Sequence, residues 1–316
     1  MKVAICGVWH VHAPGYTNEA LKTEGVEVIG FYEEDEALKA DFESRVPVKA
    51  FASFEELLES DADAVIVCAS SDTHADYIVR LAEAKKDIFT EKVLALTTED
   101  CLRVKKAVED NGVRFVISFP HKCLGGIQTI KKMADSGELG KINYVRFRNC
   151  HSGSIGNWLP PHFFDAKQCG GGAMIDLGAH GMYLIDWFLG LPKKYASAFT
   201  VWDHNEKNKS GLEDNATTVM TYEDGAIAVN ETGFVSFAEP VIFEVNGDKG
   251  SVRYIYGQGI KKCTEASARQ TVDVEEGEGI INPLAAFLRG EAPEGCGIEE
   301  ALHLTQMMEG AYKNIM

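Results

Sequence analysis

The sequence lacks the features that mark membrane, secreted and nucleic-acid-binding proteins. It has no run of about 18 apolar residues, and its first strand-like segment, residues 3–6, leaves no room for a signal peptide. None of its eight cysteines stands in a Cys-x-x-Cys spacing, so we expect free thiols in a reducing compartment. The net charge of -17 argues against a nucleic-acid partner. We therefore expect a cytoplasmic protein that binds neither membranes nor nucleic acid.

The pattern of apolar residues changes soon after residue 120 and predicts two domains. Up to that point strand-like and helix-like segments alternate, which predicts a Rossmann domain over residues 1–120: a doubly wound parallel sheet with helices on both faces. After Lys141 several strands show period-two alternation and are joined by short polar turns such as Glu223-Asp224-Gly225. Residues 121–316 are therefore expected to form an α+β domain with a mostly antiparallel, open sheet.

The loop after the first strand contains part of a dinucleotide-binding fingerprint. Gly7 stands where the fingerprint needs a glycine for its tight turn, but Trp9 and His12 occupy the positions of the other two glycines. Glu33, at the end of the second strand, is placed to bind a ribose diol, and Glu34 beside it would repel a 2′-phosphate. This pair favours NAD over NADP. The predicted cofactor site begins with Gly7, Trp9, His10, Val11 and Glu33.

Polar residues follow two later strands of the predicted sheet, at the carboxyl ends where ligands bind in open α/β sheets. A lysine here, Lys92, either reaches solvent or places a cation beside a ligand oxygen, and we favour the second interpretation. Thr73 and His74 also begin a helix and could simply cap it. These strand ends add Ser70, Ser71, His74, Glu91 and Lys92 to the predicted cofactor site.

A glycine-rich turn, Gly170 to Gly172, precedes a largely apolar helix that is predicted to run from Met174 to about Leu189. Asp176 and His180 are four residues apart and so share one face of that helix. A carboxylate and an imidazole on an apolar helix are costly to bury unless they are paired or functional. From this stretch alone, a packing pair and a catalytic pair both remain open.

Several motifs occur in a characteristic order: Thr73-His74 after the buried strand 64–69, Glu91-Lys92, Ser136-Gly137-Glu138-Leu139-Gly140-Lys141, and Gly170-Gly171-Gly172 before Asp176 and His180. Together they resemble the glucose-fructose oxidoreductase/inositol dehydrogenase/MocA family over nearly the whole chain. The resemblance implies an NAD(P)-dependent oxidoreductase acting on a secondary hydroxyl of a sugar, cyclitol or related polyol. It also implies a homodimer or homotetramer formed through the sheet of the second domain.

The resemblance implies roles for individual residues. The lysine of the family's Glu-Lys-Pro motif matches Lys92, although Val93 replaces the proline, and the family's Asp and His match Asp176 and His180. His180 would act as the general base, Lys92 would hydrogen-bond the same substrate oxygen, and Asp176 would orient His180 or bind a neighbouring hydroxyl. No metal is expected. The predicted substrate contacts are Lys92, Lys122, Trp158, His162, Asp176, His180 and Tyr183.

Two other functions remain open at this point. The incomplete glycine loop is also compatible with a dinucleotide-binding sensor or an inactive partner subunit. His10 and His12 form a His-x-His just after the first strand, as in metal-dependent hydrolases built on (β/α)₈ barrels. That fold needs eight βα units, whereas the sequence shows about five before the antiparallel pattern begins.

Overall fold

The computed structural model describes residues 1–206, 208–237 and 239–316, which form two compact units. Unit 1 comprises Met1–Ser118 and Ile281–Thr305, and unit 2 comprises Phe119–Ile280 and Gln306–Met316. The division predicted at residue 120 differs at residues 281–305, which pack with the first sheet. The N–H of Ile117 donates to the carbonyl of Cys296 at 2.9 Å, which attaches this late segment to unit 1.

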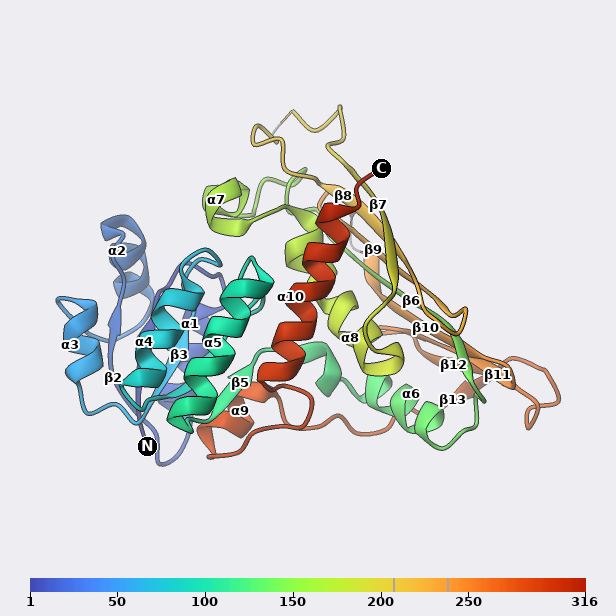
Figure 1. Ribbon diagram of the computed structural model, residues 1–316, viewed down its shortest axis with the longest axis horizontal. Coiled ribbons are helices and arrows are strands. Elements are labelled where there is room, and N and C mark those ends of the chain that lie inside the picture. Colours follow the sequence, from blue (N-terminus) through green and yellow to red (C-terminus); the bar gives the residue numbers. More distant parts are fainter. Residues whose placement is uncertain (207, 238) are drawn as a thin grey trace. The chain divides into compact units, whose positions relative to one another are not determined.

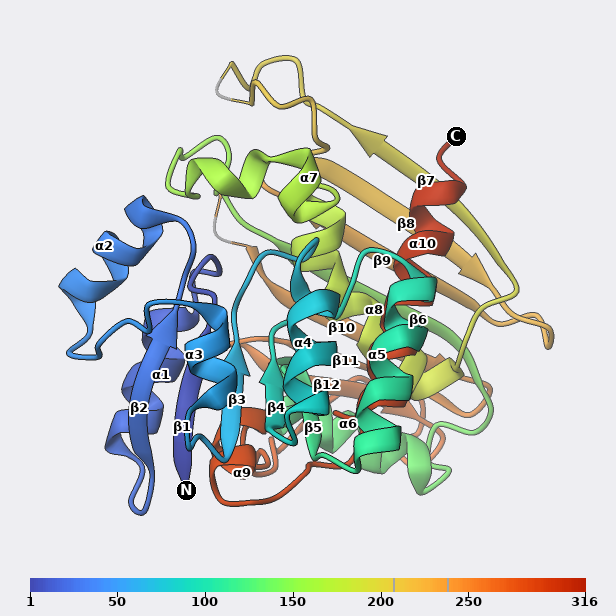
Figure 2. The ribbon, with the colours of Figure 1, turned by 60° about the vertical axis from the view of Figure 1, so that its left-hand side comes forward.

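Unit 1 is built on a parallel sheet with the strand order β2-β1-β3-β4-β5 (Figure 2). Its strands are β1 (Lys2–Cys6), β2 (Glu27–Tyr32), β3 (Ala64–Val67), β4 (Asp87–Thr90) and β5 (Phe115–Ile117). All four residues of β3 are buried, as expected of a central strand covered on both faces. The predicted doubly wound parallel sheet is confirmed.

Six helices belong to unit 1: α1 (Ala13–Lys22), α2 (Glu36–Arg45), α3 (Phe54–Glu59), α4 (His74–Glu83), α5 (Thr98–Asn111) and α9 (Pro283–Leu288). The helices α4 and α5 pack together in front of the sheet in Figure 2, whereas α1 contacts α9. Helix α2 was not predicted from the sequence, because Phe42 is its only buried residue and its other residues form no apolar stripe. Asp35 nevertheless caps α2 by accepting the N–H groups of Ala37 and Leu38.

Unit 2 contains an eight-stranded sheet with the order β13-β12-β11-β10-β6-β9-β8-β7. Its strands are β6 (Ile142–Cys150), β7 (Lys194–Thr200), β8 (Asn215–Thr221), β9 (Ile227–Gly233), β10 (Glu239–Gly247), β11 (Gly250–Ile255), β12 (Gly259–Thr264) and β13 (Val272–Val274). Among the strand pairings that the structure describes in this sheet, β6–β9 alone is parallel, which confirms the mostly antiparallel sheet. The edge strand β13 and its neighbour β12 were not predicted, because charged residues such as Lys261 and Asp273 interrupt their apolar pattern.

Helical segments of unit 2 cover one face of this sheet. They include α6 (Gly125–Asp135), the π-helical turn η3 (Met174–Gly178) and α8 (Ala179–Leu189), of which α6 and α8 are labelled in Figure 1. Unit 2 also contains η1 (Pro120–Cys123), η2 (Pro161–Phe164) and α7 (Ala166–Cys169), whereas α10 (Ile298–Lys313) begins in unit 1 and ends in unit 2. On the other face, Arg146 forms ion pairs with Glu231 at 2.7 Å and Glu244 at 3.0 Å. That outer face therefore carries a charge network.

Two of the expectations from the sequence concern membrane-spanning helices and disulfide bonds. Within the described part of the chain, no helix is both long and apolar enough to cross a bilayer. None of the eight cysteines, all of which are described, takes part in a disulfide. The second observation confirms the expectation drawn from their spacing.

The three glycines before η3 give the backbone close contacts that no side chain would allow. A Cβ on Gly171 would lie 2.0 Å from the Tyr312 hydroxyl, and one on Gly172 would lie 2.1 Å from the Glu213 carbonyl oxygen. The Glu213 carboxylate accepts the N–H groups of Gly172 and Met174, each at 3.0 Å, and the Tyr312 hydroxyl at 2.6 Å. Glu213 therefore caps the start of the helix from inside unit 2.

We expect Glu213→Ala to destabilise the protein, because it leaves two buried N–H groups and a buried hydroxyl without their acceptor. One such unsatisfied group costs about 1–3 kcal/mol, so the free energy of unfolding should fall by about 3 kcal/mol. Urea denaturation followed by circular dichroism measures the change. The exposed Glu206 of the same loop gives the matched control, Glu206→Ala, whose effect should stay within about 0.5 kcal/mol. Equal losses in the two variants would contradict the capping role.

Candidate active site

The helix that carries the predicted catalytic pair begins with a wide turn. The prediction of one regular α-helix from Met174 to Leu189 is wrong for its first five residues, which form the π-helical turn η3. A widened turn displaces backbone carbonyls from their usual partners, and Asn230 of β9 donates its side-chain amide to the Gly178 carbonyl at 2.8 Å. Asp176 lies in this turn and is half-buried. The sheet of unit 2 thus holds the local geometry around Asp176.

His180 follows in α8, and aromatic neighbours fix its ring. Its Nδ1 lies 2.9 Å from the Tyr183 hydroxyl, which also accepts the backbone N–H of His121 at 3.1 Å. The rings of His121 and His180 lie 4.2 Å apart, and Tyr183 stacks on Phe119 at the same centroid distance. Tyr183 therefore fixes the Nδ1 side of the His180 ring.

Tyr183 itself was predicted to line the substrate wall, but the structure buries it. Its exposed fraction is 1%, compared with 8% for His180. Burial of a tyrosine is favourable when its hydroxyl is hydrogen-bonded, and here the hydroxyl has two partners from unit 2. Its hydroxyl therefore positions the His180 ring, and substrate contact by Tyr183 stays a prediction.

The other predicted substrate residues of unit 2 lie in different environments. Lys122 in η1 is buried, and its ammonium lies 5.3 Å from the ring centroids of both Phe119 and Trp187. Such cation–π contacts explain how a lysine tolerates burial. Trp158 is 56% exposed, and His162 in η2 is half-buried. Substrate contact by Lys122, Trp158 and His162 stays a prediction.

In unit 1, Glu91 and Lys92 follow directly after β4 and are both buried. The Glu91 carboxylate lies 2.7 Å from Nδ1 of His12, accepts a hydrogen bond from the Tyr16 hydroxyl, and accepts the Lys92 N–H at 3.0 Å. Burial by itself would raise the pKa of Glu91. The imidazoles of His10 and His12, together with the Lys92 ammonium, outweigh that effect and hold the pKa well below its usual range.

His74 is the first residue of α4, and its side chain is buried. It is 1% exposed, and its Nδ1 lies 2.9 Å from the Val93 carbonyl, next to Lys92. Burial lowers the pKa of His74, so its ring is neutral at pH 7. His74 thus holds the chain after Lys92, and cofactor contact by His74 stays a prediction. Ser70 is buried and bonds Asp72 at 2.6 Å, whereas Ser71 is half-buried.

The loop after β1 retains the glycine that the tight turn needs. Gly7 has a φ of +74°, and a Cβ there would lie 2.4 Å from the Ala69 Cα, so only glycine is compatible with this position. The ring of Trp9 is packed inside the protein, with 8% exposure, whereas Val11 is 46% exposed. The backbone N–H of His10 is held by the Cys68 carbonyl at 3.0 Å. The bulk of Trp9 is therefore buried and not presented to solvent.

Glu33 lies beside the same loop, where a ribose acceptor is expected. Its carboxylate accepts the N–H of Val8 at 2.8 Å and that of Asp35 at 3.0 Å, and burial raises its pKa. Glu34 next to it is exposed. A half-buried carboxylate at the end of β2, beside a glycine turn, has the chemistry that a dinucleotide ribose needs. These residues therefore fit NAD.

The sequence analysis missed several residues that support the predicted site. In unit 2 they are His121, Glu213, Asn230 and Tyr312, and in unit 1 they are Tyr16 and Ser118, whose hydroxyls lie 2.9 Å apart. A sequence signal existed only for Tyr16, which follows His12 by four residues and so lies on the same side of the chain entering α1. The others come from segments far away in the sequence.

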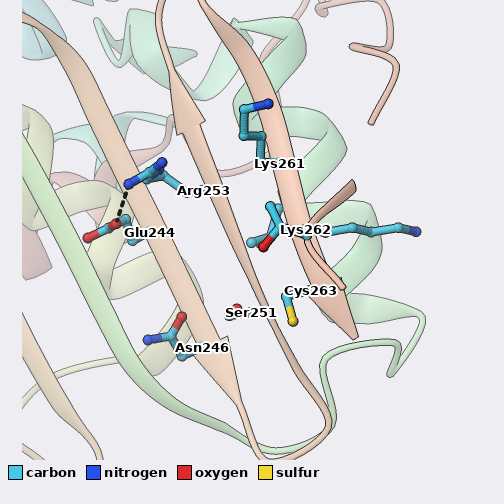
Figure 3. Close-up of a pocket in the computed structure, with 9 residues that line it drawn as sticks. Glu244, Asn246, Ser251, Arg253, Lys261, Lys262 and Cys263 are labelled. Carbon is cyan, nitrogen blue, oxygen red and sulfur yellow. Dashed lines mark ion pairs between the residues drawn. The ribbon is translucent and has the colours of Figure 1, made fainter. Parts of the chain in front are cut away.

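A depression also lies on the outer face of unit 2, over β10, β11 and β12 (Figure 3). Polar and charged side chains line it, and Arg253 forms an ion pair with Glu244 at 3.9 Å. None of the predicted site residues contributes to it. It is therefore a feature of the outer sheet face, separate from the residues assigned to chemistry.

Comparison with known proteins agrees with this architecture. The model of an oxidoreductase family with an NAD-binding Rossmann fold matches residues 1–119, and that of the GFO/IDH/MocA C-terminal domain matches residues 127–253. The inositol 2-dehydrogenase of Salmonella typhimurium is 26% identical over 281 residues, which cover 86% of this chain and 80% of that protein.

Two solved structures share the fold. An oxidoreductase from Agrobacterium radiobacter in complex with NAD+, L-tartaric acid and magnesium aligns with a TM-score of 0.82 at 15% identity, over 99% of this chain and 96% of that one. A levoglucosan dehydrogenase in complex with NADH and levoglucosan aligns with a TM-score of 0.82 at 18% identity, over the same shares.

The buried, neutral His74 predicts a pH-dependent stability. Its pKa is lower in the folded than in the unfolded chain, so the unfolded chain binds more protons below about pH 6.5 and stability falls as the pH falls. In His74→Asn, whose amide can still donate to the Val93 carbonyl, the decrease in the free energy of unfolding from pH 7 to pH 5 should be smaller. Urea denaturation at several pH values measures it, with the exposed His204→Asn as control. Identical pH dependence in wild type and His74→Asn would contradict the assignment.

Proposed function

The chain belongs to the glucose-fructose oxidoreductase/inositol dehydrogenase/MocA family, and on that premise we propose that it is an NAD-dependent dehydrogenase. The proposed substrate is a sugar, cyclitol or related polyol, oxidised or formed at a secondary hydroxyl. The observation that carries the proposal is the fixed ring of His180, held at Nδ1 by the buried Tyr183 on the helix after the glycine turn. The names of the related inositol and levoglucosan dehydrogenases support this substrate class.

When bound, NAD supplies the nicotinamide carbon that accepts or returns the hydride. In the proposed mechanism, Nε2 of His180 takes the proton of the substrate hydroxyl, because a neutral imidazole is a suitable base near pH 7. The Lys92 ammonium donates a hydrogen bond to the same oxygen and stabilises its developing negative charge. Asp176 binds a neighbouring hydroxyl or orients His180. The positioning by Tyr183 reduces the number of ring orientations that His180 can adopt.

The proposed cofactor contacts come from the loop after β1 and from the strand ends of unit 1. Gly7, Trp9, His10 and Val11 form the loop, and Glu33 accepts the ribose hydroxyls. Ser70, Ser71, Glu91 and Lys92 belong to the strand ends. NAD is favoured over NADP because Glu33 and Glu34 present two carboxylates where a 2′-phosphate would lie.

The two alternative functions, a metal-dependent hydrolase and a sensor or inactive partner subunit, agree less well with the fold and with these residues. The five-stranded sheet of unit 1 and the antiparallel sheet of unit 2 contradict the (β/α)₈ barrel that the metal-dependent hydrolase would need. A sensor or inactive partner subunit is favoured only by the missing glycines at Trp9 and His12. The presence of Lys92, Asp176 and His180 together favours an active enzyme.

The predicted homodimer or homotetramer through the C-terminal sheet stays a prediction. The outer face of that sheet supports it. Val219 of β8 and Ile227 of β9 lie on this face or at its margin, and their exposed fractions are 37% and 41%. Apolar side chains on an uncovered sheet face are commonly buried in an oligomer.

We expect Lys92→Ala and His180→Ala each to lower turnover by about 100-fold or more, because each removes a group that acts in the transition state. If the two side chains act on one oxygen, the double variant should lose far less than the product of the two single losses. NADH formation with a panel of polyols and sugars measures this. The exposed Lys106→Ala and His204→Ala serve as controls with unchanged turnover. Wild-type turnover in either catalytic variant would reject its assignment.

We expect Glu33→Ala to weaken NAD binding by about 10-fold, because it removes the acceptor of the ribose hydroxyls. Glu34→Ala should leave the Kd for NAD unchanged and lower the Kd for NADP, because it removes a charge that repels the 2′-phosphate. Calorimetric titration of both variants with both nucleotides separates the two roles. An unchanged Kd for NAD in Glu33→Ala would show that the ribose lies elsewhere.

A further inference from the structure

Three side chains of the kinds that bind transition metals meet in unit 1. His10 and His12 lie in the loop between β1 and α1, and Glu91 follows β4. Their ligand atoms all lie within 4.8 Å of one another. Two imidazoles and one carboxylate form a His₂Glu set, which in zinc sites leaves a fourth position open for water.

The distances in this cluster suit a metal ion. Nδ1 of His12 lies 2.7 Å from Oε1 of Glu91, and Nδ1 of His10 lies 3.9 Å from the same oxygen. A tetrahedral zinc with bonds of roughly 2.0–2.1 Å holds its ligand atoms roughly 3.3 Å apart. The two observed separations lie on either side of that value, and all three ligand atoms lie within 4.8 Å of one another.

A local hydrogen bond holds the ring of His10. Its Nδ1 accepts the backbone N–H of His12 at 3.2 Å, so the single lone pair of that nitrogen is directed at this N–H. The rings of His10 and His12 lie 4.6 Å apart and are inclined by 60°. An ion would take the place of the N–H at Nδ1, exchanging one neutral hydrogen bond for a metal bond.

The carboxylate has a second layer of support, as metal ligands usually do. The Tyr16 hydroxyl donates to Oε1 of Glu91 and lies 2.9 Å from Ser118 Oγ, while the N–H of Lys92 donates to Oε2 at 3.0 Å. These bonds fix the carboxylate before any ion arrives. Because Glu91 is 1% exposed, its orientation is also set by packing.

Access and charge define which ions fit. The side chain of His12 is 48% exposed and offers a path from solvent, whereas those of His10 and Glu91 are buried. The Lys92 ammonium interacts with Glu91 and opposes a second positive charge. Ions held mainly by charge, such as Mg²⁺ and Ca²⁺, are therefore disfavoured, and ions with high affinity for imidazole, such as Zn²⁺ and Co²⁺, are favoured.

We propose that His10, His12 and Glu91 bind one divalent transition-metal ion, with a water molecule as the fourth ligand. The histidine that replaces a fingerprint glycine at position 12 supplies the solvent-facing ligand. The site requires only residues of unit 1 and does not depend on the proposed dehydrogenase activity.

The test uses the full chain, treated with a chelator and free of nucleotide. Zn²⁺ is titrated by calorimetry, and Co²⁺ by its visible absorption, which is intense for a tetrahedral site and weak for the hydrated ion. We expect a single ion per chain and no thiolate-to-cobalt band. His12→Ala, the variant at the exposed ligand, should weaken binding by more than about 100-fold, and Tyr16→Phe, which removes the support of Glu91, by about 10-fold.

The exposed His204→Ala is the matched control and should bind Zn²⁺ as the wild type does. Binding that His12→Ala leaves unchanged, a thiolate band that reveals cysteine ligands, or no binding at all would each overturn the proposal. NAD binding is measured on the same preparation without metal. A protein that binds NAD but no Zn²⁺ refutes only the metal site, and one that binds Zn²⁺ but no NAD refutes only the proposed function.

Discussion

The buried carboxylate of Glu213 is the interaction on which the geometry of the predicted catalytic helix depends. It accepts two backbone N–H groups where the chain enters the wide turn, and Tyr312 supplies a third hydrogen bond. Burial raises its pKa, so the folded protein bears a cost that these three donors offset in part. The position of Asp176 and the start of the helix that carries His180 are thereby tied to a loop between β7 and β8.

A second buried carboxylate has the corresponding role in unit 1. Glu91 is enclosed by donors from the loop after β1, from α1 and from its own backbone, and it immediately precedes Lys92. In unit 1 the predicted catalytic cation thus directly follows a carboxylate that is satisfied by fixed donors, and in unit 2 such a carboxylate caps the turn that precedes His180. Such arrangements keep reacting groups in place without relying on flexible surface contacts. They also explain why polar residues occur in segments whose apolar pattern is otherwise typical of the hydrophobic core.

The loop after β1 shows how the fold accommodates departures from a common motif. Gly7 is the one glycine of the fingerprint present, and the close approach of Ala69 requires it. Trp9 is tolerated with its ring buried, and His12 because it reaches Glu91. The same departures that weaken the sequence pattern therefore create contacts of their own.

Local patterns in the sequence determined the parallel and antiparallel sheets and the need for glycine at the turn before Met174, because each depends on residues close together in the chain. The catalytic roles of Lys92, Asp176 and His180 follow from the family resemblance and stay a prediction. Tertiary structure alone decided what these residues contact. Glu213 bonds Gly172, which lies 41 residues earlier in the chain, and Tyr312 bonds Ile175, which lies 137 residues earlier. Asn230 of β9 bonds Gly178, and residues 281–305 join unit 1. Periodicity shows which face of an element is buried, but the partner on that face is selected by packing of the whole unit.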